Sequence, residues 1–249
     1  MTTLSDSKIL VIGASSGVGR ATAVSLVALG AKVVAAARHR ERLDELRAAA
    51  AGALETRTLD ATDGAALSRV LAEVRPDHVV LSAGSHSRLA LVDEHDWESF
   101  SLPWNQDVKM AFELGRAALA LPLRRGSTVV IVSSGAGLGG SPLSGGYAGA
   151  KRMQMFLASY LARASQERSL GLRFVSVVPK QLLVGTETAH QVSRAYAKLA
   201  GITPEKFMER FEQPLDAQAV ASAITSVLEG KLAPESATLV VTGKGTELL

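Results

Sequence analysis

The sequence predicts an α/β fold in which a parallel sheet lies between two layers of helices. Short, β-branched apolar runs alternate with helical patterns along the whole chain. A glycine-rich turn joins the first apolar run to the first helical pattern, and no linker-like segment divides the 249 residues. Because strands separated by helices connect through right-handed crossovers, we expect one domain: a doubly wound three-layer sandwich with a seven-stranded parallel sheet.

The predicted elements follow these two patterns in order. The expected strands are Lys8–Ile12, Lys32–Ala37, Leu54–Leu59, His78–Ser82, Thr128–Val132, Arg173–Val178 and Thr238–Val241. The expected helices are Gly17–Leu29, Arg40–Ala50, Asp63–Val74, Asn105–Leu121, Tyr147–Glu167 and Asp216–Leu228. One long excursion, Lys180–Leu215, contains its own helical stretches. Because it follows the carboxyl end of a strand, we expect a substrate lid around residues 180–215.

The composition argues against several classes of function. The net charge is +3 and the basic residues are scattered, so nucleic acid is not an expected partner. The chain has no cysteine, which excludes disulfides and thiolate-bound metal and suits the cytoplasm. We expect no metal, no signal peptide and no membrane span, because the most apolar stretch, Ala21–Ala37, is interrupted by Gly30 and Lys32.

The first strand–helix junction has the spacing of a nucleotide-binding turn. Gly13 permits the tight turn, Gly17 lets the backbone approach a phosphate, and Gly19 lets the helix pack on the strand. The free N–H groups and dipole at the helix start favour a pyrophosphate. An ordinary tight turn could have the same spacing, but doubly wound sheets bind nucleotides at this position. The residues expected to bind the cofactor here are Gly13, Ser15, Ser16, Gly17, Val18 and Gly19.

The ends of the next three strands continue the cofactor site. Ala37 stands where an acidic residue would hold a ribose 2′-hydroxyl, and Arg38 supplies a guanidinium suited to a 2′-phosphate. We therefore expect NADP(H) to be preferred over NAD(H), although a solvated arginine is the alternative. Asp60 and Ala61 lie where an adenine could be met. Three small residues after the fourth strand would let the cofactor lie against the backbone, or form a plain turn: Ser82, Ala83 and Gly84.

The candidate chemistry follows the fifth strand. Tyr147 and Lys151 are four residues apart, which places them on one face of a helix. A nearby ammonium favours the phenolate form of a tyrosine. Ser134, at the preceding strand end, could orient a carbonyl oxygen. Together these groups can donate a proton to a carbonyl that receives a hydride. A lone Tyr-x-x-x-Lys is common by chance, and its context here makes it informative.

These motifs, in this order and at these separations, resemble the short-chain dehydrogenase/reductase family, in its compact single-domain branch. The resemblance covers nearly the whole chain and implies a Rossmann-like fold. It also implies that Tyr147 is the general acid/base, that Ser134 holds the substrate oxygen, and that Lys151 binds the nicotinamide ribose. Pro179 would lie beside the nicotinamide, and the hydride would be of the B side. Family members are commonly tetramers, so we expect a homo-oligomer, either a tetramer or a dimer.

The chain departs from the family pattern at four positions: Ile12, Ser82, Asp107 and Lys180. Asp107 stands in the place of an asparagine that completes the family's proton relay, although Asn105 is close. We count Asp107 among the catalytic candidates. Its carboxylate near Lys151 would stabilise the ammonium and partly cancel the effect of that ammonium on Tyr147.

The function that these residues predict is reduction of a ketone or 3-oxoacyl carbonyl to an alcohol, or the reverse, with NADP(H). The substrate would be a small molecule, and the residues do not identify it. The alternative is an NADP-binding regulatory protein with the same fold and little or no turnover. A nucleotide-sugar epimerase is a weaker third hypothesis, because such enzymes usually have a longer C-terminal substrate domain.

Overall fold

The computed structural model describes residues 4–121, 123–232 and 237–248. It contains a single sheet of eight strands in the order β3-β2-β1-β4-β5-β6-β7-β8. The strands are β1 Lys8–Ile12, β2 Lys32–Ala37, β3 Leu54–Thr58, β4 His78–Leu81, β5 Thr128–Val132, β6 Arg173–Pro179, β7 Thr238–Thr242 and β8 Gly245–Leu248. All the neighbouring pairs from β3 to β7 are parallel, so the predicted α/β class and the doubly wound order are confirmed.

The expected seven-stranded parallel sheet was wrong in one detail, at the C-terminal edge. β8 runs antiparallel to β7, with Thr242 opposite Gly245 at the turn. The sequence of β8 is short and its centre is polar, Thr246-Glu247, so it lacks the apolar run by which the other strands were found. An antiparallel strand at the edge of a sheet can face water, so it needs no apolar run.

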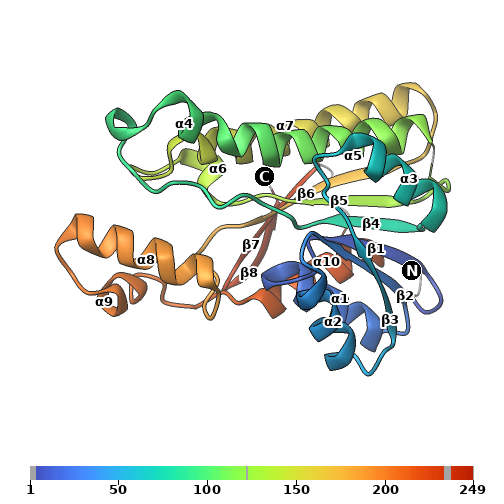
Figure 1. Cartoon of the computed structure of the whole chain (residues 1–249), viewed down its shortest axis with the longest axis horizontal. Helices are drawn as coiled ribbons and strands as arrows, with labels where there is room; N and C mark the ends of the chain where they lie inside the picture. The colour runs from blue at the N-terminus through green and yellow to red at the C-terminus, as the bar shows by residue number, and fades with distance from the viewer. Residues whose placement is uncertain (1–3, 122, 233–236, 249) are drawn as a thin grey trace.

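Helices cover both faces of the sheet. They are α1 Gly17–Ala28, α2 Arg40–Ala49, α3 Gly64–Val74, α4 Trp97–Pro103, α5 Lys109–Ala120, α6 Ala136–Gly139, α7 Gly145–Glu167, α8 Glu187–Ala200, α9 Pro204–Met208 and α10 Ala217–Leu228, with short turns η1 Val92–Glu94 and η2 Trp104–Val108. Figure 1 shows α1, α2 and α10 below the sheet and α3, α5 and α7 above it. The alternation of side chains along each strand explains the two layers.

Strand β1 illustrates how one sequence supplies both cores. Ile9 and Val11 pack into the cluster that contains α1 and α10 residues, whereas Leu10 and Ile12 pack into the cluster of α3, α5 and α7. All four side chains are almost completely buried. The central strands are therefore apolar on both faces, as strands of a parallel sheet covered by helices are.

The helix expected over Asn105–Leu121 is divided. An α-helix over Trp97–Pro103 leads into a π-helical turn, η2, and only then into α5. Pro103 has no N–H to donate to the helical ladder, and π-turns accommodate such irregularities within a helix. This turn carries Asp107, so the irregular backbone lies beside the candidate site.

The segment between β6 and α10 carries α8 and α9, which project beyond the sheet at the left of Figure 1. Its aromatic side chains pack on one another: the Tyr196 and Phe207 rings stack with their centroids 5.6 Å apart, and Phe211 meets Phe207 edge-on. The Tyr196 hydroxyl contacts the Ser141 hydroxyl and accepts a hydrogen bond from the Leu143 N–H at 3.2 Å. Tyr196 thereby joins α8 to the loop before α7.

Among the helices that the structure describes, none is both long enough and apolar enough to cross a membrane.

A buried histidine links two central strands at the amino end of the sheet. His78 begins β4 and is 7% exposed, and its Nδ1 accepts a hydrogen bond from the Thr128 N–H of β5 at 3.1 Å. Burial lowers the pKa of His78, and the charge of Arg173 lowers it further, while Asp77 offsets part of the effect. A protonated Nδ1 could not accept this bond, so the folded protein keeps His78 neutral to lower pH than the unfolded chain does.

We expect this histidine to make the protein less stable in acid. Below about pH 6.5 the unfolded chain binds a proton that the folded chain rejects, so the free energy of unfolding falls by up to about 1.4 kcal/mol per pH unit. His78→Asn keeps an acceptor for Thr128 without the titration, and urea unfolding between pH 5 and 7 should show a shallower slope. Exposed His190→Asn is the control; an unchanged slope for His78→Asn would contradict the assignment.

Candidate active site

The glycine-rich turn after β1 has the geometry that its spacing predicts. Gly13 has a φ of 86°, and a Cβ added there would collide with the backbone of Ala83. A Cβ on Gly19 would collide with the Gly13 carbonyl, so α1 packs directly on the turn. Gly17, with a φ of 51°, has no atom within 4 Å of the position that a Cβ would occupy. The turn is closed on the strand side and open at Gly17, which fits a phosphate group approaching the helix start.

A cavity of about 120 Å³ opens beside this turn, at the carboxyl ends of β1, β2 and β4. It brings together nine of the residues expected to bind the cofactor: Gly13, Ser15, Ser16, Arg38, Asp60, Ala61, Ser82, Ala83 and Gly84. Val18, by contrast, is buried in the core below the sheet, so its side chain faces away from the cavity. The residues present thus fit a dinucleotide along the edge of the sheet.

Two basic residues besides Arg38 line this cavity. They are His39 and Arg42, which were not singled out from the sequence. Arg42 lies on the first turn of α2, the helix that begins two residues after Arg38. His86, from the loop after β4, also lines the cavity.

The Asp60 carboxylate forms hydrogen bonds within its own loop. Its Oδ1 accepts hydrogen bonds from the N–H of Thr62 at 2.9 Å and from the Thr62 hydroxyl at 2.8 Å. These bonds, that of the backbone N–H foremost, and the charge of Arg38 lower the pKa of Asp60, so it is an anion at neutral pH. Asp60 therefore holds the loop after β3 and offers its remaining oxygen to the cavity.

Tyr147 and Lys151 come together on α7, as their spacing predicts. Helix α7 begins at Gly145, and the Lys151 ammonium lies 5.3 Å from the centroid of the Tyr147 ring. Tyr147 is partly exposed, whereas Lys151 is 4% exposed. The tyrosine is thus open to a ligand and the lysine supports it from inside the protein.

Lys151 forms a buried ion pair with Asp107 from the turn η2. The Lys151 Nζ lies 3.0 Å from Asp107 Oδ2, and the other oxygen, Oδ1, accepts a hydrogen bond from the Ser85 N–H at 2.7 Å. Burial by itself lowers the pKa of Lys151, but the Asp107 carboxylate and Tyr147 outweigh it, so this pKa lies above its usual value. Asn105, the neighbouring alternative, is exposed and donates to Ser101. Asp107 is therefore the residue that reaches Lys151.

The two serines after β5 have different surroundings. Ser133 is buried and its hydroxyl donates to the Lys151 carbonyl at 2.7 Å, so it is committed to the fold. Ser134 is partly exposed, and its hydroxyl accepts from the Ala136 N–H at 3.3 Å. The Ser134 hydroxyl keeps its own proton for a ligand, so Ser134 stays the candidate for orienting a carbonyl oxygen.

The unusual Pro179-Lys180 pair lies beside these serines. Gly135 donates its N–H to the Pro179 carbonyl at 2.7 Å, which holds β6 against the loop after β5. The Lys180 side chain reaches Glu247 of β8, 3.3 Å away. Lys180 is thus held by an ion pair at the C-terminal edge, while Pro179 stays next to the site. Thr186, in the segment after β6, caps α8 by accepting from the Ala189 N–H.

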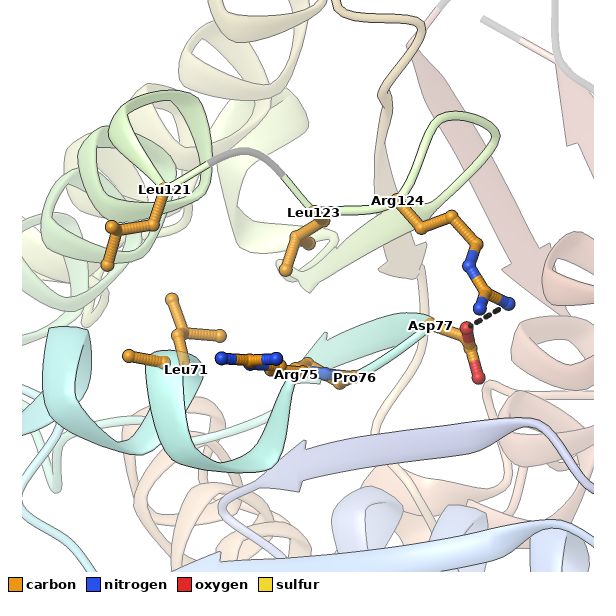
Figure 2. Close-up of a pocket in the computed structure, with 8 residues that line it drawn as sticks. Leu71, Arg75, Pro76, Asp77, Leu121, Leu123 and Arg124 are labelled. Carbon is orange, nitrogen blue, oxygen red and sulfur yellow. Dashed lines mark ion pairs between the residues drawn. The ribbon is translucent and has the colours of Figure 1, made fainter.

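A larger cavity, of about 480 Å³, lies at the opposite end of the sheet (Figure 2). It lies between the last turn of α3 and the segments that lead into β4 and β5, and Figure 2 shows the ion pair between Asp77 and Arg124 at its side. None of the predicted site residues lines it. The candidate active site is therefore assigned by its chemistry and by its place at the carboxyl ends of the strands.

Comparison with known proteins agrees with this geometry. A model of the short chain dehydrogenase family matches residues 7–197. The chain belongs to this family. An uncharacterized oxidoreductase of Listeria monocytogenes is 29% identical over 233 residues, which cover 82% of this chain and 88% of the relative. The predicted family is confirmed, and the protein is an NAD(P)-dependent oxidoreductase that acts on CH–OH or carbonyl groups.

One further relative and one solved structure are also similar to this chain. A 3-oxoacyl-acyl-carrier-protein reductase of Salmonella typhimurium is 30% identical over 181 residues, or 67% of this chain and 70% of the relative. The crystal structure of an NAD⁺-bound xylitol dehydrogenase matches with a TM-score of 0.82 at 18% identity, covering 97% of this chain and all of the other. The second likeness shows the shared fold.

The effect of Asp107 on the pKa of Lys151 can be tested without a substrate. In Asp107→Asn, the amide oxygen still accepts from Ser85, but the charge that offsets the burial of Lys151 is lost. We expect the pKa of Lys151 to fall by more than about one unit, because buried lysines without a counter-charge lose several units. Lysine NMR titration measures it, with the exposed Asp93→Asn variant as the matched control. A Lys151 titration that is the same in Asp107→Asn and in the wild type would exclude Asp107 as the source of the shift.

Proposed function

We propose that this protein is an NADP(H)-preferring reductase of small ketones or 3-oxoacyl compounds, or the corresponding alcohol dehydrogenase. The observation that carries the proposal is the partly exposed Tyr147 beside the buried Lys151, at the same edge of the sheet as the glycine-rich turn. A phenol supported by a buried ammonium is a suitable proton donor to a carbonyl oxygen. A substrate carbonyl would lie between Tyr147 and Ser134.

Each residue of this chain then has a distinct task. The Ser134 hydroxyl donates to the carbonyl oxygen and orients it, and Tyr147 transfers its phenolic proton to that oxygen as the alcohol forms. A nicotinamide cofactor, when bound beside these residues, would supply the hydride for the carbonyl carbon. Lys151 stabilises the phenolate that Tyr147 becomes, and also offers an N–H to the ribose of the cofactor. In the reverse direction the phenolate removes the proton of the alcohol.

Asp107 makes this site different from one with a neutral side chain in its place. Its carboxylate holds Lys151 in the ammonium form and, because the two charges oppose each other, weakens the field of that ammonium at Tyr147. We propose that Asp107 takes part in moving protons between Lys151 and its surroundings. The lid around residues 180–215 would cover the substrate, with Tyr196 joining it to the loop before α7.

The proposed cofactor preference rests on Arg38. With Arg42 it lines the cavity, where a 2′-phosphate would be held. We expect NADPH to bind more tightly than NADH, and Arg38→Ala to weaken NADPH binding about 10- to 100-fold with little effect on NADH, since a hydrogen bond to a charged group contributes about 1.5–3 kcal/mol. Nicotinamide fluorescence titration measures both, and Arg47→Ala, at an exposed arginine of α2, is the control.

Two results of that titration would change the proposal. Equal affinities for NADPH and NADH in the wild type would overturn the preference for NADP(H) and leave the reductase proposal in place. Binding of neither nucleotide would overturn the reductase proposal and would indicate that the departures at Ser82, Asp107 and Lys180 have disabled the site.

Tyr147 gives the test of the chemistry itself. In a screen of ketones and 3-oxoacyl thioesters with NADPH, we expect Tyr147→Phe to lower kcat at least about 100-fold, the scale of general acid catalysis, while NADPH binding stays within about threefold of wild type. Tyr160 lies exposed on the same helix, and the control variant Tyr160→Phe should keep full activity. Turnover by Tyr147→Phe at the wild-type rate would remove Tyr147 from its proposed role.

The surfaces of α5 and α7 support a homo-oligomer, which we propose to be a tetramer or a dimer. Phe112, Phe156 and Tyr160 are each about half exposed, and the Phe156 and Tyr160 rings stack with their centroids 5.9 Å apart. Exposed aromatic side chains that lie together commonly mark an interface. Sedimentation equilibrium would distinguish tetramer, dimer and monomer. We also propose the cytoplasm as its location, since the cysteine-free sequence needs no oxidising compartment.

A further inference from the structure

A glutamine that no motif singled out lies fully buried behind the candidate catalytic residues. Gln154 is on α7, three residues after Lys151, and is 0% exposed. Its Oε1 accepts a hydrogen bond from the Lys151 ammonium at 3.0 Å, and its Nε2 donates to the backbone carbonyl of Asp107 at 3.0 Å. Both ends of the buried amide are therefore used, each toward the Asp107–Lys151 ion pair.

These contacts form a closed ring. From Asp107 Oδ2 the ring passes to the Lys151 Nζ, then through the Gln154 amide, and returns to the carbonyl of Asp107. The Ser85 N–H, 2.7 Å from Oδ1, fixes the rotation of the Asp107 carboxylate within it. An ammonium held by an ion pair on one side and a buried amide on the other is restricted more than by a single ion pair.

The donors of Lys151 can be counted. An ammonium has three N–H bonds. One points to Asp107 and one to Gln154, so a single N–H is left, and Tyr147 lies 5.3 Å from the nitrogen, measured to the ring centroid. The ring thus decides both the position of the ammonium and how many bonds it can make to a ligand.

The irregular turn η2 explains why a side chain can reach this carbonyl. Asp107 lies within the π-helical turn Trp104–Val108, where the regular hydrogen-bond ladder of the helix is interrupted. A side chain from a neighbouring element can hydrogen-bond to the backbone at such an interruption. Gln154 from α7 does so here, and it thereby couples the π-turn to the catalytic lysine.

We propose that Gln154 is a positioning residue that, together with Asp107, fixes the ammonium of Lys151 and leaves it one N–H for the ligand. The inference rests on the proposed function only for the identity of that ligand, a ribose hydroxyl of the nicotinamide nucleotide. A purely structural role, in which Gln154 only ties α7 to η2, is the alternative that the experiment must exclude.

The groups around Lys151 make its titration a direct measure of this role. The charged or titratable neighbours are Asp107 from η2 and Tyr147 from α7 itself. A Cβ placed on Gly84, in the loop after β4, would lie 3.7 Å from the Lys151 Nζ, and the Ser133 hydroxyl, after β5, meets the backbone carbonyl of Lys151. Neither residue titrates, so a change at Gln154 acts on the Lys151 titration through its amide and through the Asp107 backbone that the amide holds.

The experiment compares two substitutions that change the amide in opposite ways. Gln154→Leu removes the acceptor, and we expect the pKa of Lys151 to fall by about one unit or more, since a hydrogen bond to a charged group is lost in a buried place. Gln154→Glu keeps an oxygen there and adds a negative charge, and it should raise that pKa. Lysine NMR titration measures both, with the Lys151 signal assigned by its loss in Lys151→Met.

Gln166→Leu is the matched control, because Gln166 is exposed on the same helix. If Gln154 has only a structural role, Gln154→Leu and Gln154→Glu would both change thermal unfolding. The pKa of Lys151 would then stay the same in both variants or shift in the same direction in both, and either result overturns the proposal. If Gln154→Leu does not fold, Gln154→Met, which keeps an unbranched shape without the amide, makes the same test.

NADPH binding, followed by nicotinamide fluorescence, separates this inference from the proposed function. If the wild type binds no nicotinamide nucleotide, the proposed function fails, while opposite shifts of Lys151 in Gln154→Leu and Gln154→Glu still establish the positioning role. If NADPH binds and the two shifts have the same sign, the positioning role fails and the proposed function stands.

Discussion

The buried ion pair between Asp107 and Lys151 is the interaction on which the site depends. Two charges taken out of water stabilise a protein only when the geometry is good and the remaining polar atoms find partners. Here the Ser85 N–H and the Gln154 amide supply partners, and the two charges lie 3.0 Å apart. The pair forms only when the loop after β4, the turn η2 and helix α7 meet. Since η2 and α7 pack together over one face of the sheet, the packing of that layer brings the two charges together.

The parallel sheet explains why the rest of the site is assembled around this pair. In a parallel sheet the carboxyl ends of all strands lie on one edge, and the loops that follow them share that edge. The glycine-rich turn after β1, Arg38 after β2, Ser82 after β4 and Ser134 after β5 are far apart in sequence and adjacent for this reason. The candidate proton-transfer residues and the cavity beside the glycine-rich turn are therefore neighbours, although a larger cavity lies at the other end of the sheet.

Much of this arrangement could be predicted because it depends on local spacing. The strand–turn–helix around Gly13 and the Tyr147–Lys151 pair need only a few residues and a regular helix, and both are found where the spacing places them. The burial of the central strands likewise follows from their own apolar residues. Other elements could not be predicted, among them β8 and η2. The strand β8 has no apolar run, and the π-turn η2 follows from Pro103 and from the contacts of α7, which no helical pattern in the sequence shows.

The sequence by itself determined the fold class and the family, because periodicity, glycine spacing and the order of motifs can be recognised without knowing how the elements pack. Only the tertiary structure decided which of Asp107 and Asn105 meets Lys151, that Ser133 is committed to the backbone while Ser134 is open, and that Gln154 closes the ring behind the ammonium. These outcomes depend on the rotation of a helix by one residue and on partners about 20 to 50 positions away, which are fixed by packing between elements and not by the pattern within any one of them.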